Sequence, residues 1–273
     1  MSHAASKVQP ITVAAIQAKK DAGEPISMVT CYDSAFGRIV EASPIDMVLV
    51  GDSLGNVMLG HDSTIPVTID DMVHHTAAVT RVVRRPFVGT DMPFMTYATK
   101  DDALRNAAKL VQKGGAHAVK LEGGEVICPQ IEALVANGIP VIGHLGLTPQ
   151  SVHALSGYKV QAKEKAAQKK LLADAKALQD AGVFCLVLEM IPAALGASVS
   201  KSLSIPTIGI GAGAGCDGQV LVLQDLLGFD ESFKPKFLKK YADLNKIVGD
   251  ALVSFNKDVK SKKFPAAEHS FGS

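Results

Sequence analysis

Ionisable side chains close six successive apolar segments of this chain, whereas the segments mostly begin with proline, glycine or small residues. The closing residues that could do chemistry are Asp52, Asp91, Lys120, Glu122, His144 and Glu189. Carboxylates, a lysine and a histidine can bind small anions, transfer protons and hold a hard divalent cation. If one fold brings these segment ends together, the chain has the side chains of an active site.

A pocket with four carboxylates needs compensating charge, because like charges force proton uptake or require a cation. Lys120 supplies one positive charge, which is fewer than the four carboxylates need. A divalent metal is the economical compensation, and oxygen ligands without a Cys/His cluster favour Mg²⁺ over Zn²⁺. We therefore expect a magnesium site with positions left open for substrate oxygens.

An aspartate that follows a strand often caps the next helix instead of serving a site. We expect this for Asp33, which precedes a helical pattern at 34–41. The same alternative stays open for Asp91, because Pro93 could begin a helix. The sequence Ser-Leu-Gly after Asp52 is a poor helix start, so capping is the weaker interpretation there.

The other four residues also have ordinary structural interpretations. Lys120 and Glu122 share one face of their strand, because side chains alternate, and could form only an ion pair. His144 taken alone could be a packed or hydrogen-bonded histidine. Glu189 stands among apolar residues in VLEMIP, where a desolvated carboxylate suits a general base or acid. Their shared position at segment ends favours a common site.

Eight short apolar segments alternate with helical patterns such as those at 103–111, 125–137 and 165–181. The segments lie at 27–31, 47–50, 87–90, 118–121, 140–143, 184–188, 207–210 and 220–223. Continuous apolar runs of this length suit parallel strands buried on both faces. Eight such units predict an α/β fold, a single (β/α)₈ TIM barrel with an N-terminal helix and a C-terminal helical extension. A doubly wound open sheet is the alternative.

In such a barrel the carboxyl ends of all strands meet at one face, where active sites lie. We expect one barrel domain over 1–273 with flexible termini at 1–10 and 265–273. The long stretch 145–162 is a candidate lid, and the lysines between 234 and 240 should lie on a solvated helical face. The glycines at 209–215 loosely match a dinucleotide fingerprint, but no helix start follows them.

Composition excludes several classes of partner. The net charge is +1 without a basic block, so neither nucleic acid nor an anionic membrane surface is expected as a partner. No apolar run approaches the roughly 20 residues of a membrane span, and the N-terminus does not resemble a signal peptide. The four cysteines are widely spaced and should be reduced thiols, which is typical of the cytoplasm.

Several ordered motifs resemble the ketopantoate hydroxymethyltransferase (3-methyl-2-oxobutanoate hydroxymethyltransferase) family over roughly 27–271. They are VGDSLG at 50–55, GHDSTIPVT at 60–68, DMPFM at 91–95, VKLEGGE at 119–125, GHLGLTPQS at 143–151, IGIGAG at 208–213, DGQ at 217–219 and EHSF at 268–271. Two departures lie outside the proposed chemistry. Cys31 replaces an expected small residue, and the region after Asp230 diverges.

The resemblance implies an Mg²⁺-dependent (β/α)₈ enzyme of pantothenate synthesis. It would transfer a hydroxymethyl group from 5,10-methylenetetrahydrofolate to 3-methyl-2-oxobutanoate, which gives 2-dehydropantoate. By motif position, Asp52 and Asp91 would bind the metal, and Glu122 would lie near it or reach it through water. The resemblance also implies a homo-oligomer, often a decamer.

Substrate contacts follow from the same resemblance. Ser53 and Lys120 would hold the carboxylate of the 2-oxo acid, and Glu189 would be the general base. The metal carboxylates Asp52 and Asp91 would then also border the substrate. We further expect His144 to order the pocket or the folate side of it.

The chemistry of a 2-oxo acid agrees with this assignment. Its carboxylate and ketone oxygens can chelate one metal, which stabilises the enolate formed when C3 loses a proton. The first alternative is another Mg²⁺ barrel of the phosphoenolpyruvate mutase and isocitrate lyase type, which would use no folate. The second is a barrel that binds a small anion without catalysis.

Overall fold

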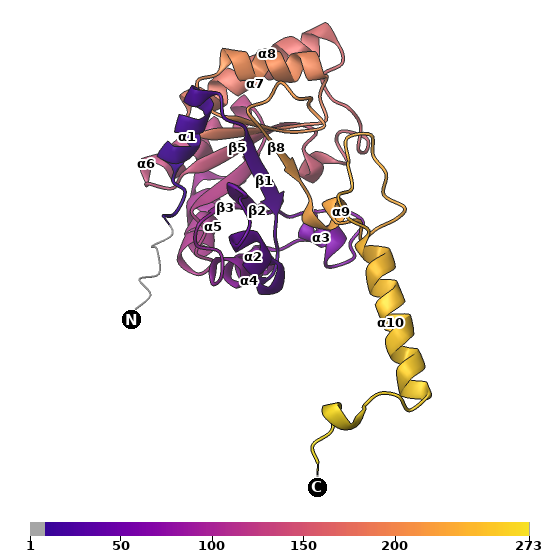
Figure 1. Ribbon diagram of the computed structural model, residues 1–273. Helices are drawn as coiled ribbons and strands as arrows, with labels where there is room; N and C mark the ends of the chain where they lie inside the picture. The colour runs from indigo at the N-terminus through magenta and orange to yellow at the C-terminus, as the bar shows by residue number, and fades with distance from the viewer. Residues whose placement is uncertain (1–8, 273) are drawn as a thin grey trace. The chain divides into compact units, whose positions relative to one another are not determined.

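The computed structural model describes residues 9–272 and contains eight strands that close into a barrel in sequence order (Figure 1). Neighbouring strands are parallel throughout, including the pair of β1 and β8 that closes the barrel. The strands are Ile26–Thr30 (β1), Met47–Val50 (β2), Phe87–Asp91 (β3), Ala118–Glu122 (β4), Val141–Gly146 (β5), Cys185–Glu189 (β6), Thr207–Ile210 (β7) and Gly218–Leu221 (β8). The predicted barrel is confirmed, and the open doubly wound sheet is excluded.

Helices accompany most of the strands. They are α1 (Val13–Ala22), α2 (Ser34–Glu41), α3 (Leu54–Val57), α4 (Ile69–Thr80), α5 (Lys100–Gln112), α6 (Cys128–Ala136), α7 (Lys165–Asp180) and α8 (Ala193–Ser202), with single 3₁₀ turns η1 (Glu125–Ile127) and η2 (Pro149–Ser151). Asp33 caps α2 as predicted, because its Oδ1 accepts from the backbone N–H groups of Ala35 and Phe36 at 2.7 and 2.9 Å.

The barrel interior is filled by apolar side chains that the strands alternately direct inward. Met28, Met47, Phe87 and Ile142 are members of this buried cluster, together with Ile16 of the N-terminal helix α1. Because burial of such side chains stabilises the fold by about 1.5–3 kcal/mol each, the strand ends above this core are held in fixed positions.

Helix α1 is tied to the amino ends of two strands by ion pairs. Lys19 Nζ lies 3.2 Å from Asp46 Oδ1, just before β2, and Lys20 Nζ lies 2.7 Å from Asp217 Oδ2, just before β8. Asp217 Oδ2 also accepts from the backbone N–H of Thr207 in β7. The N-terminal helix therefore covers the end of the barrel opposite the ionisable strand ends.

The glycine-containing segment between β7 and β8 is a loop without a helix. A dinucleotide site needs strand, turn and helix in that order, so the fingerprint interpretation fails here. Gly213 and Gly215 instead allow close packing against Ala193 and Ala197 of α8, where an added Cβ would collide.

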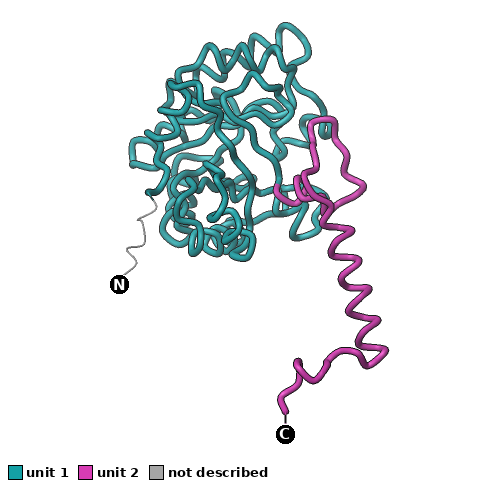
Figure 2. The backbone as a smooth tube through the Cα atoms, viewed as in Figure 1, with its two compact units in different colours: residues 1–222 teal, residues 223–273 magenta. Residues whose placement is uncertain are grey.

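The chain divides into two compact units, Met1–Val222 and Leu223–Ser273 (Figure 2). All eight strands belong to the first, whereas the sequence predicts one barrel domain over 1–273. The second contains α9 (Leu223–Leu226), the predicted C-terminal helix α10 (Leu244–Lys260) and the 3₁₀ turn η3 (Ala267–His269). Of the termini expected to be flexible, 1–8 and 273 lie outside the described residues.

The prediction that the lysines between 234 and 240 lie on a helix is wrong. This stretch is irregular, and α10 begins only at Leu244, where Asp243 Oδ1 accepts from the backbone N–H of Lys246 at 3.4 Å. Pro235 disfavours helical backbone in the residue before it, which explains the difference. None of the helices within residues 9–272 combines the length and apolar character needed to cross a bilayer.

Candidate active site

The carboxyl ends of β2 to β6 bring the predicted site residues to one cavity. Strand register places Asp91 beside Lys120, and Glu122 beside His144. The cavity has a volume of about 100 Å³ and is lined by all seven residues singled out from the sequence: Asp52, Ser53, Asp91, Lys120, Glu122, His144 and Glu189. Parallel strands of one barrel therefore produce the convergence that the spacing of the segment ends predicts.

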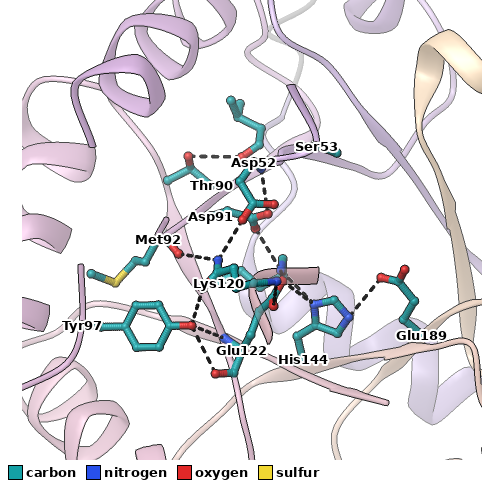
Figure 3. Close-up of polar contacts among 12 residues, drawn as sticks. Asp52, Ser53, Thr90, Asp91, Met92, Tyr97, Lys120, Glu122, His144 and Glu189 are labelled. Atoms are coloured by element: carbon teal, nitrogen blue, oxygen red, sulfur yellow. Dashed lines mark hydrogen bonds and ion pairs between the residues drawn. The ribbon is translucent and has the colours of Figure 1, made fainter. Parts of the chain in front are cut away.

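Lys120 is the central cation of the site (Figure 3). Its Nζ lies 3.2 Å from Asp91 Oδ1, 3.5 Å from Glu122 Oε1 and 3.0 Å from His144 Nδ1. Burial alone would lower the pKa of Lys120, but Asp91, Glu122 and Asp52 outweigh it and raise the pKa above its ordinary value. Lys120 therefore carries a positive charge in a pocket where it is only 3% exposed.

His144 connects two carboxylates on opposite sides of its ring. Nδ1 lies 3.3 Å from Glu122 Oε1, and Nε2 lies 3.2 Å from Glu189 Oε2. Burial and the charge of Lys120 lower the pKa of His144, but Glu122 and Glu189 outweigh them and raise the pKa to about 9. Glu122 and Glu189 therefore favour the protonated imidazole, whose Nε2 lies against Glu189 at the edge of the cavity.

Asp52 and Asp91 lie side by side as buried carboxylates. The backbone N–H of Asp52 donates to Asp91 Oδ2 at 3.0 Å. Burial raises the pKa of both, for Asp52 with the further contributions of Asp91 and Glu122. Neither residue caps a helix: Asp91 is the last residue of β3, and Ser53 is the residue that precedes α3.

Glu122 differs from the two aspartates because its oxygens already have partners. Burial alone would raise the pKa of Glu122, but Lys120 and His144 lower it below the ordinary value. Its Oε2 accepts from the backbone N–H of Gln150 at 3.1 Å. Glu122 therefore pairs with both Lys120 and His144.

Sequence reasoning missed three neutral residues that contact this cluster. Gln150 Nε2 donates to Asp52 Oδ2 at 2.8 Å, and Tyr97 donates its hydroxyl proton to Gln150 Oε1 at 2.6 Å. Tyr32 OH and Ser53 Oγ are 2.8 Å apart. Ionisable residues at strand ends are visible in a sequence, whereas a buried amide or phenol in a connecting loop carries no comparable signal. Gln150 does stand inside the motif GHLGLTPQS.

The donor set of this pocket fits a hard divalent cation. Asp91 Oδ1 is buried without a hydrogen-bond partner among the described residues, although Lys120 Nζ is nearby. The raised pKa values of Asp52 and Asp91 show that nearby cations do not offset the cost of burying these carboxylates. Within residues 9–272, however, no three His, Cys, Asp or Glu side chains are grouped to hold a metal. Mg²⁺ needs only one or two carboxylates, so the pair suffices.

The cavity also has an apolar side. It is formed by Leu49, Val187, Ile210 and Val220, which come from β2, β6, β7 and β8. One water takes about 10–15 Å³ of such a volume, so the cavity suits a ligand of roughly seven to ten heavy atoms. A small acid with a charged end and an aliphatic end matches the two sides.

Known proteins resemble this chain over nearly its whole length. The family model of ketopantoate hydroxymethyltransferase matches residues 10–267. A 3-methyl-2-oxobutanoate hydroxymethyltransferase of Thermoanaerobacter sp. (strain X514) is 55% identical over 253 residues, which are 92% of each chain. The protein of that name from Carboxydothermus hydrogenoformans is 52% identical over 262 residues, covering 96% of this chain and 95% of its own.

Solved structures with the same fold are more distant in sequence. A phosphonopyruvate hydrolase in complex with oxalate and Mg²⁺ has a TM-score of 0.60 at 12% identity, covering 94% of this chain and 92% of its own. A 2,3-dimethylmalate lyase of the PEP mutase/isocitrate lyase superfamily has a TM-score of 0.58 at 14% identity, covering 95% and 91%. At such identities the similarity shows the fold alone.

Proposed function

The chain belongs to the ketopantoate hydroxymethyltransferase family and is a hydroxymethyltransferase of the pantothenate pathway, and from this premise we propose how its cavity performs the reaction. The single observation that carries the proposal is the cavity itself, where two cations and four carboxylates meet an apolar wall. Its substrate would be 3-methyl-2-oxobutanoate, and its one-carbon donor 5,10-methylenetetrahydrofolate.

The charged end of the 2-oxo acid would be held by Ser53 and Lys120. Tyr32 OH, 2.8 Å from Ser53 Oγ, fixes the position of this hydroxyl, and Lys120 supplies the charge for the carboxylate. The aliphatic end would lie against Leu49 and Val187, where burying each methyl-sized group contributes about 0.8 kcal/mol.

Asp52 and Asp91 would hold Mg²⁺, and Glu122 would reach it through water at most, because its oxygens are engaged by Lys120, His144 and Gln150. When bound, the cation would supply Lewis-acid polarisation of the substrate ketone. The two aspartates would also border the substrate, since both line the same cavity.

Glu189 would be the general base that removes the proton from C3. Its side chain is 16% exposed and lies at the cavity edge, with Oε2 held by His144 Nε2. The methylene carbon of the folate is bonded to two nitrogens, and both of these C–N bonds break. Water adds its oxygen to that carbon, and the carbon nucleophile forms the new C–C bond with it. The C3 proton and one proton of the water go to the two nitrogens, and tetrahydrofolate leaves. His144 thus acts by orienting the base.

The test of this function is product formation. Purified protein with Mg²⁺, 3-methyl-2-oxobutanoate and 5,10-methylenetetrahydrofolate should give 2-dehydropantoate and tetrahydrofolate in equal amounts. Omitting the folate should abolish the product. Turnover of the 2-oxo acid without folate would instead support a lyase or mutase, whose fold this chain shares. No turnover at all, with either set of reactants, would support a barrel that only binds an anion.

We also propose a cytoplasmic homo-oligomer, with the decamer as the expected size. All four cysteines are free thiols, as expected in a reducing compartment. The helix α10 has no buried residue, and its apolar side chains Ile247, Leu252 and Phe255 are each more than half exposed. An apolar helix surface of this kind is suited to contact with another subunit. Sedimentation of the full chain would measure the oligomer size.

A further inference from the structure

Gln150 is a buried glutamine whose side chain and backbone contact the carboxylate cluster. It lies in the 3₁₀ turn η2 after β5 and is only 4% exposed. Its Nε2 donates to Asp52 Oδ2 at 2.8 Å and to the backbone oxygen of Met92 at 2.9 Å. Its backbone N–H donates to Glu122 Oε2 at 3.1 Å.

Asp52 Oδ2 and the Met92 carbonyl fix which way the amide of Gln150 points, because both can only accept, and Tyr97 contacts the other end of the amide. The Tyr97 hydroxyl accepts from the backbone N–H of Glu122 at 3.3 Å and donates to Gln150 Oε1 at 2.6 Å. Both protons on Nε2 then face acceptors, namely Asp52 Oδ2 and the Met92 carbonyl. Each proton of the amide therefore has an acceptor. If the amide were turned over, Gln150 Oε1 would face Asp52 Oδ2 and the Met92 carbonyl oxygen, with no proton between them.

These bonds join loops that are far apart in sequence. They connect Asp52 after β2, Met92 and Tyr97 after β3, Glu122 at the end of β4 and Gln150 after β5. A buried hydrogen-bond network in which every member is satisfied holds its side chains in one arrangement. Oδ2 of Asp52 accepts from Gln150, whereas no hydrogen bond engages Oδ1 among the described residues, so Oδ1 is the oxygen left to bind a ligand.

We propose that Gln150, whose amide oxygen accepts from Tyr97, is a positioning residue that presents Asp52 Oδ1 to the divalent cation and anchors the β5–α7 connection over the site. This inference rests on the proposed magnesium-dependent function. Residues that hydrogen-bond to metal ligands typically change metal affinity by about 10–100-fold when they are replaced. The same bonds fix the start of the β5–α7 connection, so any movement of the candidate lid 145–162 is confined to the part beyond Gln150.

Isothermal titration of the metal-free full chain with Mg²⁺ tests the proposal without an activity assay. Gln150→Met keeps the shape of the side chain but removes its donors and acceptor, and should weaken Mg²⁺ binding about tenfold or more. Gln161→Met is the matched control, because within residues 9–272 the Gln161 side chain donates only to the backbone oxygen of Lys159 in the same connection. This control should leave the Kd unchanged.

Tyr97→Phe provides a second, milder variant. It removes the proton donated to Gln150 Oε1 without adding volume, and should weaken Mg²⁺ binding less than Gln150→Met does. The double variant should bind Mg²⁺ no more weakly than Gln150→Met alone, because both changes act through one amide. Thermal unfolding of each variant shows whether a change in Kd accompanies loss of folded protein.

The outcomes separate this inference from the function on which it rests. A weaker Kd for Gln150→Met with unchanged Kd for Gln161→Met supports it. Unchanged Mg²⁺ affinity for both Gln150→Met and Tyr97→Phe overturns it, and so does a lower Tm with the wild-type Kd, which would indicate a purely structural role. If Gln150→Met does not fold, the Kd of Tyr97→Phe decides alone. Failure of the wild-type chain to bind Mg²⁺ overturns both proposals.

Discussion

His144 and Glu189 face each other from the neighbouring strands β5 and β6, with Nε2 of the imidazole 3.2 Å from Oε2 of the carboxylate. The other ring nitrogen of His144 contacts Glu122. Among the described residues the proposed base is contacted from one side only, at Oε2, and its second oxygen is left to meet substrate. A glutamate placed in this way can accept a proton without losing its position.

Stability of the metal-free protein should fall as pH rises from about 6.5 to about 9. The pKa of His144 is raised in the folded state to about 9, from 6.5. A raised pKa contributes stability that is complete below the unfolded value and is lost as pH rises through the folded value. Thermal unfolding at a series of pH values measures this loss, and His144→Gln should flatten the curve in that range. An unchanged pH dependence in this variant would show that other groups cause it.

Replacing Asp52 by asparagine should stabilise the metal-free protein. Burial, Asp91 and Glu122 raise the pKa of Asp52, so its ionised form is unfavourable in the folded state. The asparagine side chain would keep an oxygen for Gln150 Nε2 and remove the charge. We expect a Tm increase of roughly 2–4 °C in chelator, the shift that about 1 kcal/mol produces in a chain of this size. The Tm increase that Mg²⁺ gives the wild type should be lost.

Asp33 is the matched control, because it also follows a strand but caps α2. Asp33→Ala should lower stability by about 1 kcal/mol, the typical cost of a lost N-cap. It should leave the response of Tm to Mg²⁺ intact. If Asp33→Ala and Asp52→Asn changed the Mg²⁺ response alike, the metal site would not be where we place it.

Replacing Gly146 should lower stability and activity, because its backbone lies against the backbone of Glu189. It has a φ of +95°, and a Cβ added there would collide with the backbone oxygen of Glu189. Gly146→Ala should therefore lower stability by more than the strain of a positive φ alone would. The collision should also displace Glu189, the proposed base. Urea unfolding measures the stability, and exchange at C3 of the substrate measures the position of Glu189.

Gly138 is the comparison for this variant, since its φ is +79° but nothing lies within 4 Å of an added Cβ. Gly138→Ala should cost about 1–2 kcal/mol, the strain of a left-handed alanine, with full activity. If Gly146→Ala and Gly138→Ala lowered stability equally, the collision of the added Cβ with the Glu189 backbone would have no effect.

Much of the fold and site could be predicted because all strands of the barrel are parallel. A residue that follows a strand in the sequence therefore lies at the carboxyl face of the barrel. Each apolar segment overlaps a strand, and the ionisable residues at the ends of β2 to β6 reached the carboxyl face. The eighth strand lies at Gly218–Leu221, two residues before its predicted position, because Gly218 pairs with Ile26 of β1. An apolar run alone does not specify such pairing.

The remaining parts could not be predicted because they depend on long-range contact rather than on local pattern. Tyr97 and Gln150 meet across 53 residues, and Tyr32 and Ser53 across 21. Neither pair has a charge or a spacing that marks it. The lysines between 234 and 240 suggested a helix by their polarity, but the stretch is irregular, and Pro235 disfavours helical backbone in the residue before it.

The central claim is that Glu189 removes the C3 proton of 3-methyl-2-oxobutanoate in a metal-dependent step. Proton exchange at C3, followed by NMR in deuterated water with folate present or absent, measures this step directly. Wild-type protein should exchange the proton with Mg²⁺ and not with chelator. Glu189→Gln should lose roughly 10²–10⁴-fold in rate while its Mg²⁺ affinity stays intact. Exchange by Glu189→Gln at the wild-type rate, or no metal-dependent exchange by the wild type, would contradict the account.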